Sequence, residues 1–386
     1  MMRHRIALQG WLFGDRLLGA PSGAKNRLAS LLVGLAELPE ARDYDITLLT
    51  GRDPDPDLDD AVRALPHGNV CRMDLCAAPT LARVRREVRI LDRATREFDL
   101  LELASLPHPR LTVRTALLVH DVRDTGTFAR SVVHRLCVRR ALRNALHRCT
   151  VAIAPSEEVA RRLRSIVDTR VEIVPAGIRV PPAQTWPQVT RVPPGALISL
   201  ARCEARKDLP FLVRAYAAAR RLRQGVLPPL VFVGPESDGW RAVSALAREL
   251  DIAPHVHFVH DVRDGERWPI LASAKALCFP TRLEGFGLPA LEAALVGCPV
   301  LVRAGSVPHA ILGDASIPVG NDADNEPKNV EDWSRAIADV AESEVAREGA
   351  ANARPRLTEC YSPERAARAW ICAWERALAS SSRAVG

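Results

Sequence analysis

The sequence predicts an α/β protein with two doubly wound parallel-sheet domains. Short apolar runs alternate with amphipathic stretches of helical period along the whole chain, as in consecutive βαβ units. The 386-residue length suffices for two cores. A cluster of prolines without periodicity predicts a linker between them. We expect an N-terminal domain over 1–178, a linker over 179–195, a C-terminal domain over 196–357 and a terminal helix over 358–379.

Composition narrows the class of protein. Apolar residues make up 47% of the chain and charged residues 26%, which is typical of a globular protein. No apolar run approaches the roughly 18 residues of a membrane span, and the first ten residues lack a signal-peptide core, so we expect a cytoplasmic location. The nine cysteines show no metal-ligand spacing, which predicts reduced thiols and no bound metal. The net charge of +7 alone suits a nucleic-acid binder, but the chain lacks a recognised module or clustered aromatics.

The N-terminal half opens as a βαβ unit, with a glycine-bearing loop between its first strand and first helix. The prolines and acidic residues of 51–60 predict a surface loop. Strands are expected at 5–9, 46–50, 100–103, 115–119, 151–156 and 171–174, and helices at 24–38, 81–96, 128–148 and 159–165.

The C-terminal half repeats the alternation of strand and helix. Ser362 and Pro363 form a start signal for the last helix, because serine caps the free N–H groups and proline has none to leave unpaired. Strands are expected at 196–200, 230–233, 256–259, 276–279 and 300–302, and helices at 209–222, 240–250, 289–296, 333–341 and 363–378.

The most informative stretch is 280–300, which reads P-T-R-L-E-G-F-G-L-P-A-L-E-A-A-L-V-G-C-P-V. It predicts a glycine loop at a helix N-terminus, where free N–H groups and the helix dipole favour an anion. Glu284 and Glu292 would lie at the carboxyl ends of the strands, where open α/β sheets bind ligands, and would accept hydrogen bonds from sugar or ribose hydroxyls. The alternative is a solvated Glu284, with Glu292 only complementing the helix dipole.

Within this stretch, E-G-F-G-L-P-A-L-E-A-A-L-V-G-C-P-V resembles the signature of the family 4 retaining glycosyltransferases, GT-B-fold enzymes that use nucleotide sugars. The resemblance covers roughly residues 6–378 and is densest over 196–314. It implies that Glu284 contacts the donor sugar, that Glu292 holds the ribose hydroxyls, and that the terminal helix crosses back to the first domain. It also implies contacts to the sugar and diphosphate from the backbone of Gly285, Phe286, Gly287 and Leu288.

Three further segments carry the resemblance on the donor side. A-R-C-E-A-R-K resembles the family's G-R-x-x-x-x-K element, which implies that Arg202 and Lys207 clasp the donor diphosphate. The backbone near Val262 and Arg263 is expected to edge the base. Gly23 belongs to a loop that resembles the family's first glycine loop, with Lys25 nearby; the alternative is an ordinary βα turn.

The strand expected at 115–119 ends in His120 and Asp121. The resemblance implies that His120 contacts the donor sugar near its reacting end, which makes His120 and Glu284 the catalytic candidates. A capping or core histidine is the alternative. Asp121 and Asp124 are expected to meet the acceptor, and with Asp15 they would suit a cationic one.

The helix expected over 128–148 is basic and amphipathic, with Phe128, Val132, Leu136 and Leu142 on its apolar side. Such a helix binds an anionic membrane surface, which would place the protein at the inner membrane surface. The alternative is a packed helix with a solvated arginine face.

The resemblance implies a retaining hexosyltransferase. The donor is a UDP- or GDP-sugar that acts as co-substrate, and no cofactor is required. The acceptor is a glycan, a lipid-linked sugar or a small molecule, as in polysaccharide or aminocyclitol antibiotic biosynthesis. The alternatives are a non-catalytic nucleotide-sugar-binding protein of the same fold and a GT-B-fold epimerase or phosphorylase.

Overall fold

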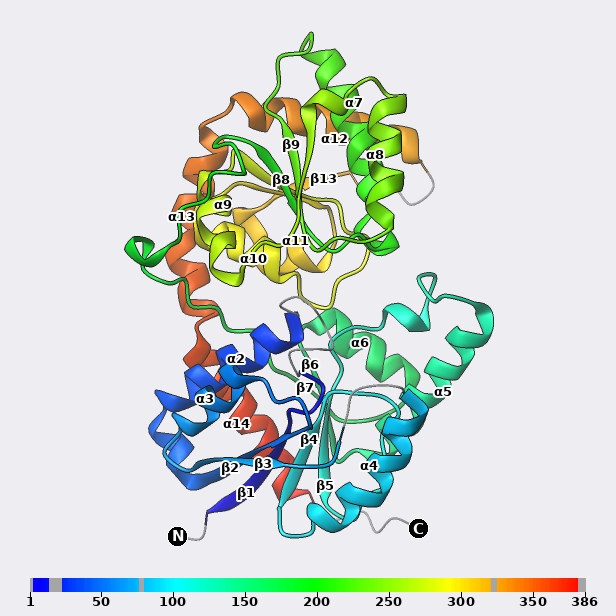
Figure 1. Ribbon diagram of the computed structural model, residues 1–386, viewed down its shortest axis with the longest axis vertical. Coiled ribbons are helices and arrows are strands. Elements are labelled where there is room, and N and C mark those ends of the chain that lie inside the picture. Colours follow the sequence, from blue (N-terminus) through cyan, green and yellow to red (C-terminus); the bar gives the residue numbers. More distant parts are fainter. Residues whose placement is uncertain (1–2, 14–22, 76–79, 321–324, 381–386) are drawn as a thin grey trace. The chain divides into compact units, whose positions relative to one another are not determined.

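The computed structural model describes residues 3–13, 23–75, 80–320 and 325–380. The chain forms two compact units, one of Met1–Arg179 with Tyr361–Gly386 and one of Val180–Cys360. Each unit has its own parallel β-sheet with helices on both faces (Figure 1). The predicted pair of doubly wound parallel sheets is therefore confirmed.

The sheet of the N-terminal unit has seven strands in the order β3-β2-β1-β4-β5-β6-β7, all parallel. The order reverses between β1 and β4, and open α/β sheets bind ligands outside the strand ends at such a point. The strands are β1 (His4–Gln9), β2 (Tyr44–Thr50), β3 (Gly68–Arg72), β4 (Leu100–Leu103), β5 (Arg114–Leu118), β6 (Val151–Ala154) and β7 (Val171–Ile173).

Alternate residues of these strands enter separate cores on the two faces, as the period of two in a strand requires. Ile6 and Leu8 share one core with the tryptophans of the terminal helix, and Ala7 belongs to the other core. The first core holds residues of α2 (Gly23–Ala36), α3 (Pro56–Arg63) and α14 (Pro363–Ala379), and the second those of α4 (Thr80–Ala94), α5 (Val132–Arg148) and α6 (Glu157–Ile166).

The terminal helix packs against α2 in the N-terminal unit although it is remote in sequence (Figure 1). Ser362 caps α14 by accepting a hydrogen bond from the N–H of Arg365 at 3.2 Å. Gly34 makes the close approach possible, because a Cβ atom there would lie 2.1 Å from the carbonyl oxygen of Pro363. The chain thus re-enters its first unit at its end.

The sheet of the C-terminal unit has six parallel strands in the order β10-β9-β8-β11-β12-β13, reversing between β8 and β11. Its strands are β8 (Leu197–Leu200), β9 (Leu230–Val233), β10 (Val256–Val259), β11 (Ala276–Phe279), β12 (Val300–Arg303) and β13 (Ile317–Val319). Its helices are α7 (Leu209–Leu222), α8 (Gly239–Glu249), α9 (Arg267–Ser273), α10 (Leu288–Leu295), α11 (Val307–Leu312), α12 (Glu326–Glu342) and α13 (Val345–Cys360).

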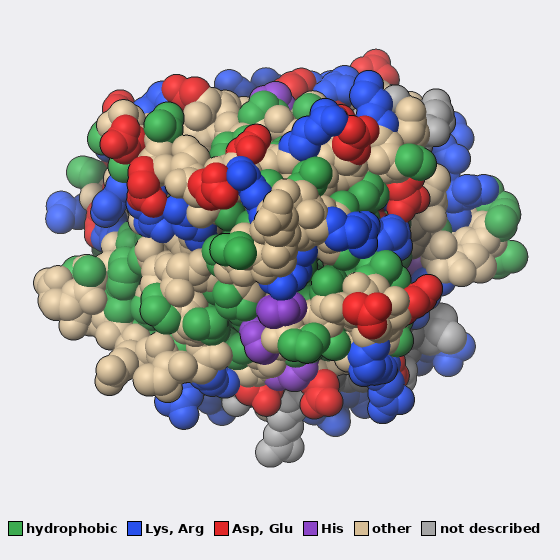
Figure 2. Space-filling view, turned by 90° about the horizontal axis from the view of Figure 1, so that it is seen from above, with side chains coloured by type: hydrophobic (Ala, Val, Ile, Leu, Met, Phe, Trp, Pro, Cys, Tyr) green, Lys and Arg blue, Asp and Glu red, His purple; other side chains and the backbone are tan. Residues whose placement is uncertain are grey.

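The many arginines are distributed among carboxylates. Acidic and basic side chains are interspersed on the face of the molecule shown in Figure 2. Arg223, directly after α7, for example, lies 3.0 Å from the carboxylate of Glu342 on α12. Exposed pairs of this kind contribute little stability, but they break the basic charge into small separate groups.

Four local predictions were wrong or incomplete. The segment 51–60 is not all loop, because Asp55 caps α3 and Pro56 occupies its first turn. The basic helix begins at Val132 rather than 128, since Ser131 caps it by accepting from the N–H of His134. The helix expected at 333–341 starts earlier, at Glu326. Strands β3 and β13 and helices α9, α11 and α13 were not predicted.

Candidate functional site

The predicted donor residues of the C-terminal unit come from loops on both sides of the point where its strand order reverses. The loop after β8 carries Arg202 and Lys207, and the loop after β11 carries Glu284. These strands are neighbours and parallel, so their carboxyl ends meet at one edge of the sheet. This edge is the usual ligand position in a doubly wound fold.

Lys207 and Glu284 form a buried ion pair, with Lys207 Nζ bound to Glu284 Oε1. Arg206 Nη1 lies 3.1 Å from the other carboxylate oxygen, so one carboxylate holds two cations. Lys207 Nζ also lies 5.1 Å from the centre of the Phe279 ring. Burial lowers the pKa of the Lys207 ammonium, and Glu284 opposes that shift. The alternative of a solvated Glu284 is excluded, because the Glu284 side chain is largely enclosed.

Asp208 ties the lysine turn to the glutamate loop. It adopts a left-handed conformation with a φ of 53°, which is uncommon for a residue with a side chain. Its Oδ2 accepts hydrogen bonds from Arg303 Nη2 and Arg282 Nε, both at 2.6 Å. The N–H of Arg282 also donates to the carbonyl oxygen of Arg206 at 2.9 Å. These contacts fix the loop after β8 against the loop after β11.

Arg202 lies partly buried at the start of the same loop. Its Nη2 is enclosed, and it has no hydrogen-bond partner among the residues that the structure describes. A buried donor without a partner costs free energy, and a ligand oxygen would satisfy it. Arg202 is therefore the guanidinium in this loop that is best prepared to receive an anion.

The glycine loop leads directly into α10. Gly287 has a φ of 94° and precedes the first residue, Leu288. A side chain there would be strained, and a Cβ atom would also lie 2.8 Å from Pro308 Cγ. Phe286 is buried, so the loop is fixed by packing on one side. The N-terminal end of α10 and Gly285 thus lie where the sequence predicts an anion-binding turn.

Glu292 belongs to a second pair, with Arg267, and makes no described contact with Glu284. Arg267 Nε lies 3.0 Å from Glu292 Oε1, and Glu292 is only 5% exposed. Burial raises the pKa of the Glu292 carboxyl, and Arg267 opposes this shift. Glu292 is thus enclosed and ion-paired, and its alternative role of only complementing the helix dipole stays open.

Val262 and Arg263, the predicted base-edging residues, lie in a turn after β10. The N–H of Arg263 donates to Glu266 Oε2 at 2.7 Å, and Arg191 Nη2 lies 2.7 Å from the same oxygen. Glu266 therefore anchors this stretch of backbone, while the Arg263 side chain is exposed.

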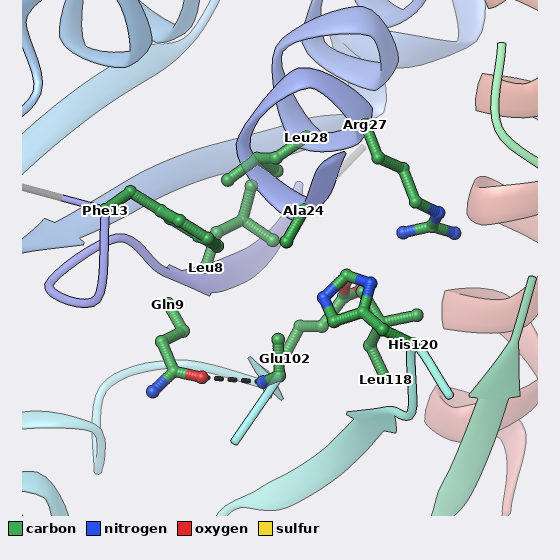
Figure 3. A pocket seen from close by; sticks show the side chains of 10 residues that line it. Leu8, Gln9, Phe13, Ala24, Arg27, Leu28, Glu102, Leu118 and His120 are labelled. Carbon is green, nitrogen blue, oxygen red and sulfur yellow. Dashed lines mark hydrogen bonds between the residues drawn. The ribbon is translucent and has the colours of Figure 1, made fainter. Parts of the chain in front are cut away.

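In the N-terminal unit, His120 lines a small pocket at the carboxyl ends of β1, β4 and β5 (Figure 3). The pocket is also lined by Gln9, Arg27 and Glu102. His120 Nε2 and Arg27 Nε are enclosed there without hydrogen-bond partners in the described structure. Burial, with Arg27 and Arg123, lowers the pKa of His120 to about 3. The imidazole is therefore neutral in the physiological pH range.

Glu102 connects this pocket to the terminal helix. Its Oε2 accepts hydrogen bonds from the indole N–H groups of Trp370 and Trp374 on α14, the latter at 2.9 Å. Burial raises the pKa of Glu102, and these two indoles oppose the shift. Arg27 Nη2 in turn donates to the carbonyl oxygen of Val174 at 2.8 Å. Hydrogen bonds from several elements thus fix the polar side chains that line the pocket.

The remaining predicted residues of this unit are already paired. Asp121 Oδ1 accepts from the N–H of Arg123 at 3.1 Å, and the Arg123 side chain lies 3.8 Å from Asp124. Gly23 is the first residue of α2. Lys25 Nζ lies 2.7 Å from Asp55 and 2.9 Å from Asp57. Asp15 lies outside the described residues.

The sequence did not single out Arg206, Asp208, Arg267, Arg27 or Glu102. Arg206 adjoins Lys207, so a charge beside the motif was the available signal. Arg267 and Arg27 had no such signal, since each is one of many arginines and only the fold brings it to its carboxylate.

Within the described ranges, no helix is long and apolar enough to cross a membrane. Nor do these ranges bring together three or more histidine, cysteine, aspartate or glutamate side chains in a way that would hold a metal ion.

Two family models match the chain. The model described as "Glycosyltransferase Family 4" matches residues 21–180, and "Glycosyl transferases group 1" matches residues 184–356. Together they cover most of both units.

Curated relatives match over part of their length. An MMP α-(1→4)-mannosyltransferase of Mycolicibacterium hassiacum is 27% identical over 245 residues, covering 62% of this chain and 56% of the relative. A D-inositol 3-phosphate glycosyltransferase of Actinosynnema mirum is 30% identical over 194 residues, covering 48% and 45%. The chain thus spans about half the length of these relatives.

Solved structures match over nearly the full chain. A sucrose-phosphate synthase from Thermosynechococcus elongatus has a TM-score of 0.73 at 20% identity, covering 98% of this chain and 100% of the other. An Anabaena protein crystallised with UDP and glucose has a TM-score of 0.68 at 14% identity, covering 97% and 100%. At these identities the likeness establishes the fold.

Proposed function

Because the chain belongs to the family 4 glycosyltransferases and has their GT-B fold, we propose that it transfers a hexosyl group from a nucleoside diphosphate sugar with retention at the anomeric carbon. The observation that carries this proposal is the cluster of Arg206, Lys207 and Glu284 where the C-terminal sheet reverses its strand order. The names of the relatives support it, since they include a mannosyltransferase and a protein crystallised with UDP and glucose. UDP- and GDP-sugars are the proposed donors.

The C-terminal unit binds the donor in this proposal. Arg202 donates a hydrogen bond to the diphosphate. Lys207 leaves the Glu284 carboxylate and binds a phosphate oxygen instead. Glu284, still held by Arg206, then accepts a hydrogen bond from the sugar, and Glu292 accepts one from the ribose. Cations fixed before the reaction stabilise the charge that develops on the leaving diphosphate, and such preorganisation is commonly the largest catalytic contribution. No cofactor beyond the nucleotide sugar is required.

The N-terminal unit binds the acceptor, with His120 meeting the sugar near its reacting end. A neutral imidazole with an unpaired Nε2 accepts or donates one hydrogen bond without bringing charge. Its role is therefore positioning by hydrogen bond rather than protonation. Asp121 and Asp124 contact the acceptor hydroxyls, and Arg123 offsets their charge. A glycan, a lipid-linked sugar or a small molecule remains the acceptor class.

The test is thermal stabilisation by UDP, GDP, ADP, TDP, CMP and a short DNA duplex. A ligand at 100 times its Kd adds about 2.7 kcal/mol of apparent stability. We expect one diphosphate to respond, and the response to disappear in Lys207→Ala and Glu292→Ala. Nucleotide binding without sugar transfer would favour the binding-protein alternative. Sugar transfer to phosphate would favour the phosphorylase alternative. A response to the DNA duplex alone would favour the nucleic-acid alternative. Proton NMR of the anomeric centre of the product then distinguishes retention from inversion.

A second partner is proposed for α5, an anionic lipid surface. Its N-terminal half exposes Val132 (62%), Val133 (71%) and Leu136 (58%), which does not fit the alternative of a packed apolar side. Residues 125–156 contain six arginines and no acidic residue. Exposed Arg139, Arg140 and Arg143 on the same helix have no ion pair within the described ranges. An apolar surface flanked by unneutralised arginines fits anionic headgroups.

Co-sedimentation with vesicles tests the lipid contact. Phosphatidylglycerol-containing vesicles should bind the protein, and pure phosphatidylcholine vesicles should not. Val133→Ser with Leu136→Ser should abolish the binding, whereas Val226→Ser, at an exposed valine of the C-terminal unit, should not. Equal binding to both vesicle types would contradict the proposal.

A further inference from the structure

Arg267 supplies a cation to the predicted ribose-binding carboxylate. It is the first residue of α9, and its Nε lies 3.0 Å from Oε1 of Glu292 on α10. The guanidinium carbon also lies 4.6 Å from the centre of the Trp268 ring. Both side chains are largely enclosed, at 16% exposed for Arg267 and 7% for Glu292. The pair is therefore a buried one with a fixed geometry.

A buried carboxylate needs such a partner. Burial raises the pKa of Glu292, so without a cation its neutral form would gain population. Arg267 opposes this shift and occupies one of the two carboxylate oxygens. The other oxygen, Oε2, has no protein partner in the part of the chain that the structure describes. Arg267 thus favours the charged form of the carboxylate, whose second oxygen can accept a hydrogen bond from a ligand.

We propose that Arg267 is the positioning residue of Glu292: it orients the carboxylate so that Oε2 accepts a hydrogen bond from a hydroxyl of a nucleoside diphosphate. This inference rests on the proposed function, because it takes Glu292 as the group that holds the ribose. Arg267 acts through Glu292 rather than on the phosphates, since its Nε lies 3.0 Å from the carboxylate in an ion pair and its guanidinium lies over Trp268. The inference adds a residue to the donor site. Its removal should change the pH dependence of nucleotide binding as well as the affinity.

A double-mutant cycle separates positioning from direct ligand contact. The affinities of UDP and of GDP are measured by calorimetry for the wild type, Arg267→Gln, Glu292→Gln and the double variant, between pH 5.5 and 8. We expect Arg267→Gln to weaken the affinity for UDP or GDP about tenfold at pH 7. This effect lies in the middle of the range of interaction energies between contacting residues. In the Glu292→Gln background the same change should have little effect.

The pH dependence provides a readout that a merely structural role would not move. Affinity should fall as the pH drops through the range in which Glu292 gains a proton. In Arg267→Gln this fall should begin at a higher pH, because only burial then acts on the carboxyl. Arg267→Lys should restore part of the affinity and the original profile. Arg223→Gln, which removes partly exposed ion pairs with Glu342 and Asp339 in the same unit, is the matched control and should change neither.

The outcomes are distinguishable. If the wild type binds UDP or GDP and Glu292→Gln weakens that binding, but Arg267→Gln changes neither affinity nor pH profile, the positioning role is wrong and the proposed function stands. An equal loss from Arg267→Gln in both backgrounds would mean direct ligand contact, which also overturns the inference. If the wild type binds neither nucleotide, the proposed function fails, and the inference falls with it.

Discussion

The two units treat the polar groups at their ligand edges in opposite ways. In the C-terminal unit the carboxylates of Glu284 and Glu292 are already held by cations, three of them in all: Arg206, Lys207 and Arg267. In the N-terminal unit His120 Nε2 and Arg27 Nε line a pocket without partners in the described structure. The first edge stores most of its charge in pairs that a ligand can exchange, and Arg202 Nη2 is the exception among the described residues. The second offers single hydrogen bonds.

This difference matches the chemistry of the two proposed ligands. A diphosphate carries negative charge, and binding it requires cations that stay ionised and fixed while buried. An acceptor hydroxyl is neutral, so a neutral imidazole suffices, and a buried charge would only add a desolvation cost. The substitutions below test whether the C-terminal edge depends on paired charge and the N-terminal edge on a neutral His120.

The largest effect is expected from Lys207→Met. Losing one preorganised cation should lower turnover roughly 100- to 1,000-fold. Breaking the buried pair with Glu284 should also cost the C-terminal unit about 3 kcal/mol, the low end for buried pairs because Arg206 remains. Steady-state kinetics and urea denaturation measure the two effects. Lys275→Met, which removes a lysine paired with Glu344 at 2.8 Å, serves as the control and should leave turnover unchanged.

Asp208→Gly tests whether the ion pairs outweigh the backbone conformation. Glycine would relieve the left-handed conformation of Asp208, but it would leave the buried guanidinium of Arg303 without its carboxylate. We expect a net loss of about 3 kcal/mol in the free energy of unfolding.

Asp251→Gly is the matched control for Asp208, because Asp251 is exposed and has a similar φ of 56°. It should be neutral or stabilising by less than about 1 kcal/mol. A stabilised Asp208→Gly would mean that the ion pairs around Asp208 contribute less than the backbone strain they accompany.

His120→Asn probes the uncharged edge through the pH dependence of stability. The folded-state pKa of about 3 lies below the ordinary value of 6.5, so the stability that depends on neutral His120 is complete above about pH 6.5 and is lost as the pH falls toward 3. Removing the imidazole should reduce the loss between pH 7 and pH 5 by up to about 2 kcal/mol. His108, with a pKa lowered by burial to about 4, should leave a residual slope.

Denaturation at the two pH values measures the effect of His120→Asn. His257→Asn, at an exposed position of β10, should keep the wild-type slope. A wild-type slope in His120→Asn would show that the imidazole becomes protonated in the folded protein.

The smallest effect is expected at Asp121 and Asp124. Arg123 pairs with both, so each carboxylate presents only part of its charge to an acceptor. Asp121→Asn or Asp124→Asn should raise the acceptor KM less than about fivefold, in line with exposed ion pairs, and leave nucleotide affinity unchanged. An unchanged KM in both variants would remove these residues from the acceptor site.

Much of the fold could be predicted because strands and helices were bounded by clear signals. Strands β10 and β11 and helix α7 have the predicted ends, since buried apolar runs and a helical period leave little choice there. Helix α3 was missed although Asp55 and Pro56 form a standard start signal, because the acidic composition favoured a loop. The exposure of Val132 and Leu136 could not be predicted, since an apolar side of a helix does not reveal whether anything covers it.

The residues of the candidate site also divide into those that the sequence predicts and those that it does not. Residues inside the motif, such as Glu284, Glu292 and Lys207, could be named from the sequence. Their partners could not, because Arg267 and Glu292 meet only after two helices have packed. The sequence also gave no sign that Lys207 and Glu284 would bind each other in the absence of ligand.

The exchange of partners by Lys207 is the central claim, and a crystal structure with the diphosphate that stabilises the protein, UDP or GDP, tests it most directly. Lys207 Nζ should have left Glu284 and should lie about 2.7–2.9 Å from a phosphate oxygen, as charge-assisted hydrogen bonds do, with Arg206 still on Glu284. A diphosphate bound elsewhere, with the Lys207–Glu284 pair intact, would contradict the claim.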